Sequence, residues 1–178
     1  FRHRSDAIGL SVGDLVDDGE FELREIEPLT ISADEFAHEV RRSVEARGAK
    51  FVLLDGTAGY KIALQDPESE LRRELHALVR YLRNMGVTVV LTDELASVTG
   101  QFQASDSHVS YLADNVLFIR YIEVDGEIQK AIGVLKKRFG EFESTLRSFA
   151  IGSDGVQVGT ALSDLRGVLT GTPTRQPK

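Results

Sequence analysis

The chain has 178 residues, and its 42% of hydrophobic and 28% of charged residues are typical of one soluble globular domain. It has no cysteine, which excludes disulfides, thiolate catalysis and cysteine–metal sites and is compatible with a cytoplasmic location. The net charge of −7 disfavours a surface dedicated to nucleic acid, and no apolar run is long enough to span a bilayer.

The residues before position 50 predict two helices with a strand between them. Residues 11–19 are typical of a short helix, and the alternation over residues 20–26 favours a strand. Ser32 and Glu35 form a capping box, which predicts the start of a longer helix. Gly48 is the natural C-terminal cap of that helix.

Two short apolar runs then predict neighbouring strands of a parallel sheet. Residues 51–54 and 87–91 are apolar at nearly every position, as expected of strands that are buried on both faces. Asp66 and Pro67 are suited to begin the helix between them, which Gly86 would end. This alternation predicts an α/β fold with a mostly parallel sheet flanked by helices.

The second half of the chain predicts antiparallel β-structure after a loop over residues 94–110. Turns are expected at Asp125-Gly126 and Asp154-Gly155. Residues 172–178 carry two prolines and no core pattern, which predicts a flexible tail after a domain that spans residues 1–171. The β-rich stretches, which form a C-terminal hairpin extension, are residues 115–124, 127–137 and 146–151.

The most informative local feature is the apolar run 51–54 followed by Asp55. An acid at the carboxyl end of a strand lies where open α/β sheets bind their ligands. It can hold Mg²⁺ through water against the phosphates of a nucleotide, as the Walker B acid of nucleotide hydrolases does. A core strand followed by an ordinary Asp-Gly turn is the alternative that these residues leave open.

Holding ATP also requires a phosphate-binding loop, and no segment of the sequence fits G-x-x-x-x-G-K-[ST]. The nearest glycine-rich piece, residues 56–61, has the wrong spacing and follows the wrong strand. The sequence starts at Phe1, and its single methionine is Met85. We therefore expect a piece that is truncated at its N-terminal side and that binds ATP poorly by itself.

A basic cluster of Lys136, Lys137 and Arg138 ends the second β-rich stretch. Alternate residues of a strand share a face, so Lys136 and Arg138 are expected to point the same way. Two cations presented together can clamp a phosphate. The alternative interpretation is a solvated strand end.

A polar stretch around Ser107, His108 and Ser110 precedes the first of the β-rich stretches. A histidine beside serines can activate a hydroxyl, and a hydrogen-bonded loop is the plainer alternative. The other histidines are scattered without the helical spacing of a zinc site, and the acid-rich residues 14–20 do not fit an EF-hand loop.

Taken in order, these pieces resemble the KaiC-like family, the circadian-clock ATPases and their bacterial and archaeal relatives. The most specific stretch of the resemblance runs from Ser107-His108 through residues 111–121. It continues over residues 131–138 and 165–173, and it covers nearly the whole chain. The ordered set of motifs, rather than any one of them, indicates the family.

The resemblance implies a RecA-like fold and a hexameric ring of identical subunits, with ATP and Mg²⁺ bound between neighbours. It implies that Asp55 is the Walker B acid, holding the metal through water. Lys136 and Arg138 match the residues that reach the γ-phosphate bound by the neighbouring subunit, where a cation can stabilise phosphoryl transfer. Asp93 occupies a cofactor-sensing position where the family often has Asn, although an acid cannot donate the amide hydrogen bond.

The resemblance also implies functions for the whole protein. Ser110 matches a serine that is phosphorylated in the clock protein, while Tyr111 stands where the adjacent threonine would be. We therefore expect an ATP-hydrolysing protein, with serine autokinase activity as a further implication and signalling proteins as partners. A non-catalytic RecA-like scaffold for assembly or signalling is the alternative, motivated by the missing phosphate loop. A DNA recombinase or helicase relative is disfavoured by the acidic balance.

Overall fold

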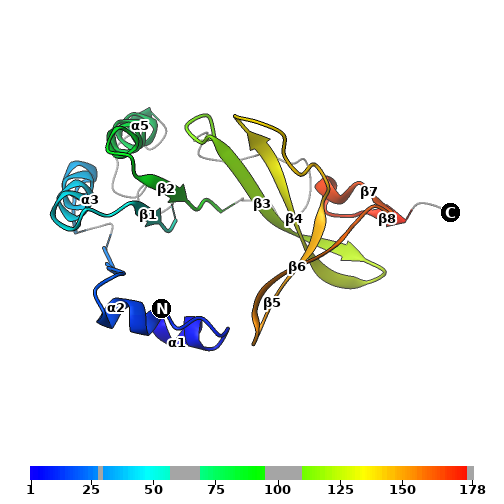
Figure 1. The fold of residues 1–178 in the computed structure, drawn as a ribbon. Coiled ribbons are helices and arrows are strands. Elements are labelled where there is room, and N and C mark those ends of the chain that lie inside the picture. The colour runs from blue at the N-terminus through cyan, green and yellow to red at the C-terminus, as the bar shows by residue number, and fades with distance from the viewer. Residues whose placement is uncertain (28–29, 57–68, 95–109, 176–178) are drawn as a thin grey trace. The chain divides into compact units, whose positions relative to one another are not determined.

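The computed structural model describes residues 1–27, 30–56, 69–94 and 110–175. Contacts within the chain divide it into two compact units, whose helices and strands are drawn in Figure 1. The parallel unit comprises the described residues from Glu25 to Ala113, and the antiparallel unit comprises residues 1–24 and 114–175. No helix among the described residues is long and apolar enough to cross a membrane.

The parallel unit has two strands and two helices. Strand β1 (Phe51–Leu54) pairs in parallel with β2 (Thr88–Leu91), with Phe51 opposite Thr88. Helix α3 (Ala33–Arg47) precedes β1, and helix α5 (Ser69–Asn84) lies between the strands in the chain. The two helices and the residue just before β2 form a common core of Ala37, Val44, Leu78, Leu82 and Val87.

Helix α3 begins and ends as the sequence predicts. The Ser32 hydroxyl accepts from the Glu35 backbone N–H at 3.2 Å, and the Ser32 N–H donates to Glu35 Oε2 at 2.8 Å. Gly48 follows the helix with a left-handed φ of 66°, and its N–H donates to the Val44 carbonyl at 2.8 Å. Both predicted caps of this helix are therefore confirmed.

The expectation that both apolar strands are buried on both faces is wrong. Phe51 and Leu53 are 56% and 44% exposed. They alternate with Val52 and Leu54, which pack against the core formed by the helices. Successive side chains of a strand point to opposite faces, and α3 and α5 cover one face of the pair.

The antiparallel unit is built on one four-stranded sheet. Both Asp125 and Gly126 have positive φ, 53° and 81°, as a type I′ hairpin turn requires, which confirms this predicted turn. The two longest strands have the bounds that the sequence predicts. In spatial order the strands are β3 (Asn115–Val124), β4 (Glu127–Lys137), β5 (Arg147–Gly152) and β6 (Gly155–Ala161).

The C-terminal segment packs against this sheet. Strand β7 (Leu165–Arg166) pairs with β8 (Thr174–Arg175), and the 3-10 helix η1 (Val168–Thr170) lies between them in the chain. Val168 joins Ile122, Val124 and Ala131 in the core of the unit.

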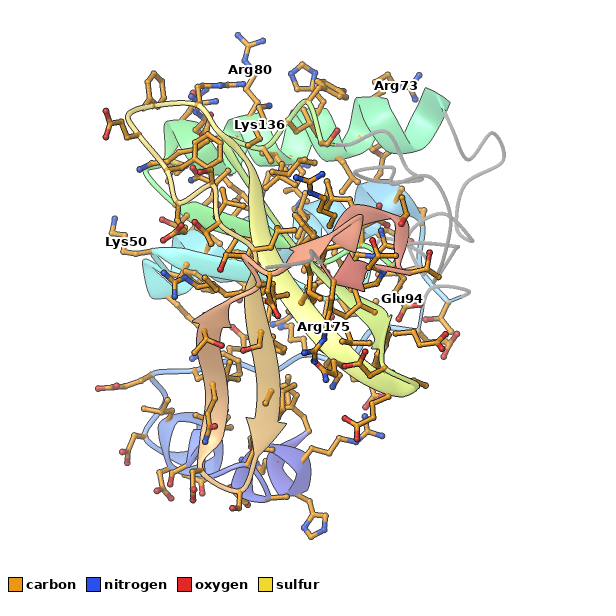
Figure 2. The ribbon with its side chains drawn as sticks, turned by 90° about the vertical axis from the view of Figure 1, so that its right-hand side faces the viewer. Lys50, Arg73, Arg80, Glu94, Lys136 and Arg175 are labelled. Carbon is orange, nitrogen blue, oxygen red and sulfur yellow. The ribbon has the colours of Figure 1, made fainter. Side chains whose placement is uncertain are left out.

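Strand β8 lies within the segment for which the sequence predicts a flexible tail. Arg175 of this strand, labelled in Figure 2, pairs with Asp125 of the β3–β4 turn at 2.6 Å. Both side chains are more than 60% exposed, so the ion pair contributes little stability. Residues 176–178 of the predicted tail lie outside the described residues.

The N-terminal segment forms helices α1 (Arg2–Asp6) and α2 (Val12–Asp17), and α2 confirms the helix predicted over residues 11–19. The strand predicted over residues 20–26 is wrong, because this segment pairs with no strand of the described residues. An alternating pattern is not sufficient for a strand, which needs the hydrogen bonds of a neighbour.

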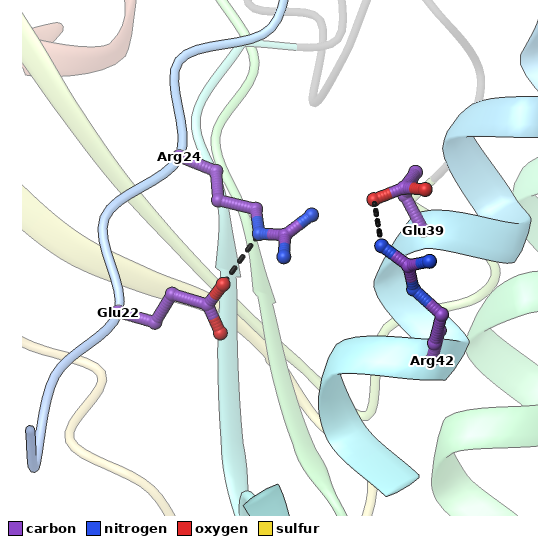
Figure 3. Close-up of polar contacts among 4 residues, drawn as sticks. All are labelled: Glu22, Arg24, Glu39 and Arg42. Atoms are coloured by element: carbon purple, nitrogen blue, oxygen red, sulfur yellow. Dashed lines mark hydrogen bonds and ion pairs between the residues drawn. The ribbon is translucent and has the colours of Figure 1, made fainter. Parts of the chain in front are cut away.

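Figure 3 shows two ion pairs, one in this segment and one on helix α3. Glu22 pairs with Arg24 two residues further on, and Glu39 pairs with Arg42 on helix α3 at 3.4 Å. The predicted helix start at residues 66–67 and most of the predicted loop over residues 94–110 lie outside the described residues.

Candidate functional site

Asp55 follows β1 directly, at the carboxyl end of the parallel strand pair. Thr92 follows β2 at the same edge, and its hydroxyl donates to Asp55 Oδ1 at 2.8 Å. The Thr92 backbone N–H also donates to the Leu54 carbonyl at 3.1 Å. The strand pairing therefore continues to Thr92 and brings its hydroxyl beside the carboxylate that the sequence singles out.

Gly56 completes this arrangement. Its backbone N–H donates to Thr92 Oγ1 at 2.7 Å, so the same hydroxyl accepts one hydrogen bond and donates another. Gly56 has a φ of 86°, in the left-handed region that glycine adopts without strain. The turn after β1 thus points its N–H back toward the end of β2.

The sequence pattern points to Asp93 at this edge but not to Thr92. Asp93 is half-buried and follows Thr92 in the chain. The signal that could have identified Thr92 is its position: it is the first residue after its strand, as Asp55 is after β1. Residues at these two places meet because the parallel strands pair with Leu54 opposite Leu91.

The basic cluster lies at the end of β4 in the antiparallel unit, where Figure 2 labels Lys136. Val134 pairs with Leu117 and Lys136 pairs with Val116, so Leu135 has no partner in this register. This is a β-bulge, and it shifts the alternation of faces by one residue.

The bulge decides which face each lysine takes. Cross-strand partners share a face of the sheet, so Lys136 lies on the face of Val116 and Phe118. Phe118 is 8% exposed and belongs to the buried side of β3. Lys137 pairs with Asn115 and therefore lies on the opposite face.

Arg138 lies one residue beyond β4, and Asp114 lies one residue before β3. The Arg138 backbone N–H donates to the Asp114 carbonyl at 2.8 Å. The two side chains form an ion pair with 2.7 Å between Arg138 Nη1 and Asp114 Oδ1. Lys137 is held differently, because its Nζ donates to the Glu141 carbonyl at 2.6 Å.

The third candidate, Ser110, is half-buried at the end of the predicted polar loop. Tyr111 beside it is 49% exposed, and its ring lies edge-on to His76 of α5 with 6.2 Å between the ring centroids. Ser107 and His108 lie outside the described residues.

The donor atoms at Asp55 suit Mg²⁺ held through water. Among the described residues, no group of three or more His, Asp or Glu side chains could hold a metal by itself. Asp55 offers one carboxylate, and the Thr92 hydroxyl contacts one of its oxygens. A carboxylate has about four lone-pair positions, so it can also accept hydrogen bonds from metal-bound water. Mg²⁺ commonly keeps several waters and takes its other ligands from substrate phosphates.

The fold has a close counterpart among solved structures. A KaiC-like protein from the hyperthermophilic archaeon Pyrococcus horikoshii OT3 matches with a TM-score of 0.76 and 22% sequence identity. The match covers 89% of this chain and 69% of that protein. The similarity defines the class of fold, an α/β RecA-like fold with antiparallel hairpins, and confirms the fold expected from the sequence.

The sequence comparisons identify the family. The family model described as "ATPase: KaiC" matches residues 1–163, so the chain belongs to the KaiC ATPase family. Circadian clock protein KaiC3 of Synechocystis sp. is 28% identical over 102 residues, which are 57% of this chain and 20% of that protein. The circadian clock oscillator protein KaiC of Thermostichus vulcanus is 32% identical over 89 residues, or 48% of this chain and 17% of that protein. The chain thus spans about a fifth of the length of these relatives.

Proposed function

We propose that this chain is part of an ATP-hydrolysing protein in which Asp55 holds the Mg²⁺ of bound ATP through water. Membership of an ATPase family implies nucleotide binding. The observation that carries the proposal is the Asp55 carboxylate at the carboxyl edge of the β1–β2 pair, held by Thr92. This edge is where open α/β sheets bind ligands.

Lys136 and Arg138 are the proposed cations that contact the γ-phosphate of ATP bound by a neighbouring subunit. Lys136 and Lys137 lie on opposite faces of the sheet, and the bulge puts Lys136 on the face of Val116, so we assign the phosphate contact to Lys136 rather than to Lys137. In this proposal the described residues of 1–171 form part of one RecA-like domain. Identical subunits assemble into a six-membered ring with each ATP between two of them.

The chemistry assigned to the chain's own residues is electrostatic. Phosphoryl transfer to water spreads negative charge over the oxygens of the transferred group, and cations placed there in advance lower the barrier. The Arg138 guanidinium presents several N–H donors in a fixed plane, and its Nη1 forms the ion pair with Asp114 Oδ1. Bound Mg²⁺ would supply further neutralisation of the phosphates, with Asp55 orienting a metal-bound water.

The proposal is tested by mixing two inactive variants of the full-length protein. Asp55→Asn subunits lack the metal acid, and Arg138→Ala subunits lack the cation. If each site combines Asp55 of one subunit with Arg138 of the next, mixed rings contain some interfaces with both groups intact. ATP hydrolysis should therefore reappear on mixing, while each variant alone stays slow. Mixed rings that remain inactive, although they assemble, would show that the site is not shared.

Lys137→Ala is the matched control for the basic cluster. It removes the same charge at the neighbouring position, but on the opposite face. Lys136→Ala and Arg138→Ala should each lower kcat by about a hundredfold or more, because a missing transition-state contact costs about 3 kcal/mol. Lys137→Ala should leave kcat within about twofold, as expected of a surface substitution. An equal loss of kcat in all three variants would show that the cluster acts only as a general basic surface.

Serine autokinase activity at Ser110 is a separate part of the proposal, and this residue is half-buried. Incubation of the full-length protein with Mg²⁺ and ATP should phosphorylate Ser110, as read by peptide mass spectrometry. Asp55→Asn should abolish that signal. If the protein hydrolyses ATP but Ser110 carries no phosphate, the autokinase proposal fails and the ATPase proposal stands.

The alternative function is a nucleotide-free scaffold for assembly or signalling. It is favoured by the absence of any G-x-x-x-x-G-K-[ST] segment from the 178 residues. A full-length protein that assembles stably but neither binds nor hydrolyses ATP would establish it in place of the ATPase.

A further inference from the structure

We infer that Thr92 is a positioning residue for Asp55: its hydroxyl fixes the orientation of the carboxylate that meets the metal-bound water. This inference rests on the proposed function and adds to it a residue that the sequence pattern does not single out. Three hydrogen bonds converge on Thr92, one from its backbone and two through its hydroxyl.

The backbone of Thr92 is held in place by a hydrogen bond of its own, independent of its side chain. Its N–H donates to the Leu54 carbonyl at 3.1 Å, which extends the register of the parallel pair by one residue. Thr92 is β-branched, so its χ1 angle is restricted and the position of its hydroxyl is defined once the backbone is held. The hydroxyl is therefore presented at the strand end without a large loss of side-chain freedom.

The direction of each hydrogen bond follows from the donors present. A hydroxyl has one hydrogen and two lone pairs. The Gly56 backbone N–H can only donate, and it reaches Thr92 Oγ1 at 2.7 Å. The single hydroxyl hydrogen is then available for Asp55 Oδ1, at 2.8 Å. Gly56 thus orients the hydroxyl, and the hydroxyl orients the carboxylate.

The consequence for metal binding is preorganisation. Without the hydroxyl, an exposed Asp side chain at a strand end can take several rotamers, and ordering it on binding costs free energy. Thr92 contacts only one oxygen, so lone pairs of the carboxylate remain for a metal-bound water. Asp55 supplies the ligand chemistry, and Thr92 supplies the orientation.

The test compares Thr92→Val with Thr92→Ser in the full-length protein. Valine keeps the shape and β-branching of threonine but has no hydroxyl, whereas serine keeps the hydroxyl. Binding is measured with Mn²⁺, a paramagnetic substitute for Mg²⁺, by electron paramagnetic resonance in the presence of a non-hydrolysable ATP analogue. Thr92→Val should weaken Mn²⁺ binding by about threefold to tenfold, the equivalent of one hydrogen bond. Thr92→Ser should stay within about twofold.

Two further measurements separate positioning from general damage. The Mg²⁺ concentration for half-maximal hydrolysis should rise in Thr92→Val, while kcat at saturating Mg²⁺ changes less. The double variant Thr92→Val with Asp55→Asn should bind Mn²⁺ no more weakly than Asp55→Asn alone, because the two residues act through one carboxylate. Thermal unfolding of each variant verifies folding, and Thr92→Ala replaces Thr92→Val if the latter is unstable.

Each remaining outcome is decisive. If Asp55→Asn weakens Mn²⁺ binding but Thr92→Val and Thr92→Ser behave alike, Thr92 has no positioning role and the proposed function stands. If Thr92→Val and Asp55→Asn weaken Mn²⁺ binding additively in the double variant, Thr92 does not act through Asp55 and the inference is overturned. If Asp55→Asn leaves Mn²⁺ binding unchanged, the metal role of Asp55 fails and the role of Thr92 fails with it.

Discussion

Arg138 is bound to Asp114 through both its backbone and its side chain. The backbone N–H donates to the Asp114 carbonyl at 2.8 Å, and Nη1 lies 2.7 Å from Oδ1 of the same residue. The two residues stand just outside the paired ends of β4 and β3, so the contact continues the hairpin ladder. It places a carboxylate beside the cation to which we assign a role in hydrolysis.

The first prediction is that Asp114 orients Arg138 for this role. Asp114→Ala in the full-length protein should lower kcat by about twofold to fivefold, in keeping with the modest free energy of half-exposed ion pairs. The variant that combines Asp114→Ala with Arg138→Ala should be no slower than Arg138→Ala alone, as steady-state ATP hydrolysis would show. Faster hydrolysis by Asp114→Ala would instead mean that the ion pair restrains the arginine.

The second prediction concerns packing under Gly133 of β4. A Cβ atom at this position would lie 2.5 Å from Leu146 Cδ2 and 2.9 Å from the Phe118 ring. Gly133→Ala should therefore lower the free energy of unfolding by about 1 to 3 kcal/mol, the usual cost of overpacking. Gly152→Ala is the control, because nothing lies within 4 Å of its Cβ position. Urea denaturation should show little change in the free energy of unfolding for Gly152→Ala. Equal losses in the two variants would argue against the close packing of Leu146 and Phe118 around Gly133.

The third prediction is a pH dependence at the start of α3. The Ser32 backbone N–H and then the Ser32 hydroxyl, as hydrogen-bond partners, lower the pKa of Glu35 from its ordinary value of 4.5. A lowered folded-state pKa means that the charged form stabilises the fold above pH 4.5, and this stabilisation is lost as the pH falls through the lowered pKa.

Glu35→Gln isolates that contribution, because glutamine keeps the hydrogen-bonding shape of the capping box without the titratable proton. The wild-type chain should be more stable than Glu35→Gln at neutral pH, and the difference should shrink as the pH falls below 4.5. Urea unfolding followed by circular dichroism at several pH values measures the difference. A difference that is constant with pH would show that the charge of Glu35 is not involved.

The fourth prediction concerns the attachment of the C-terminal segment. Arg120 of β3 is only 8% exposed, and its guanidinium donates to the Leu169 carbonyl in η1. Arg120→Ala should cost about 2 to 4 kcal/mol of unfolding free energy, because it removes this bond and leaves a cavity. Arg166→Ala, at an exposed position of β7, should change stability by less than about 0.5 kcal/mol. Amide hydrogen exchange of residues 165–171 should also become faster in Arg120→Ala but not in Arg166→Ala.

Several elements follow from interactions that span only a few residues, and these were predictable. Ser32 and Glu35 form the capping box within one turn of helix, and Gly48 ends that helix through its own backbone conformation. Asp125 and Gly126 likewise form the hairpin turn by themselves. Such features are readable in a sequence because both partners stand close together in it.

Elements whose partners lie far away in the chain were not predictable in the same way. Residues 20–26 alternate as a strand does, yet no strand of the described residues pairs with them. Phe51 and Leu53 are as apolar as their neighbours, but α3 and α5 cover the other face of β1. Burial depends on which elements pack together, and a local pattern does not contain that information.

The sequence by itself determined the chemical components of the candidate site: an acid after an apolar strand at Asp55, and a basic cluster that includes Lys136 and Arg138. The tertiary structure decided how they are presented. Thr92 reaches Asp55 across 37 positions of sequence, and the bulge at Leu135 sets the face of Lys136. Both depend on cross-strand register, which arises from pairing between distant segments and therefore appears only when the chain is folded.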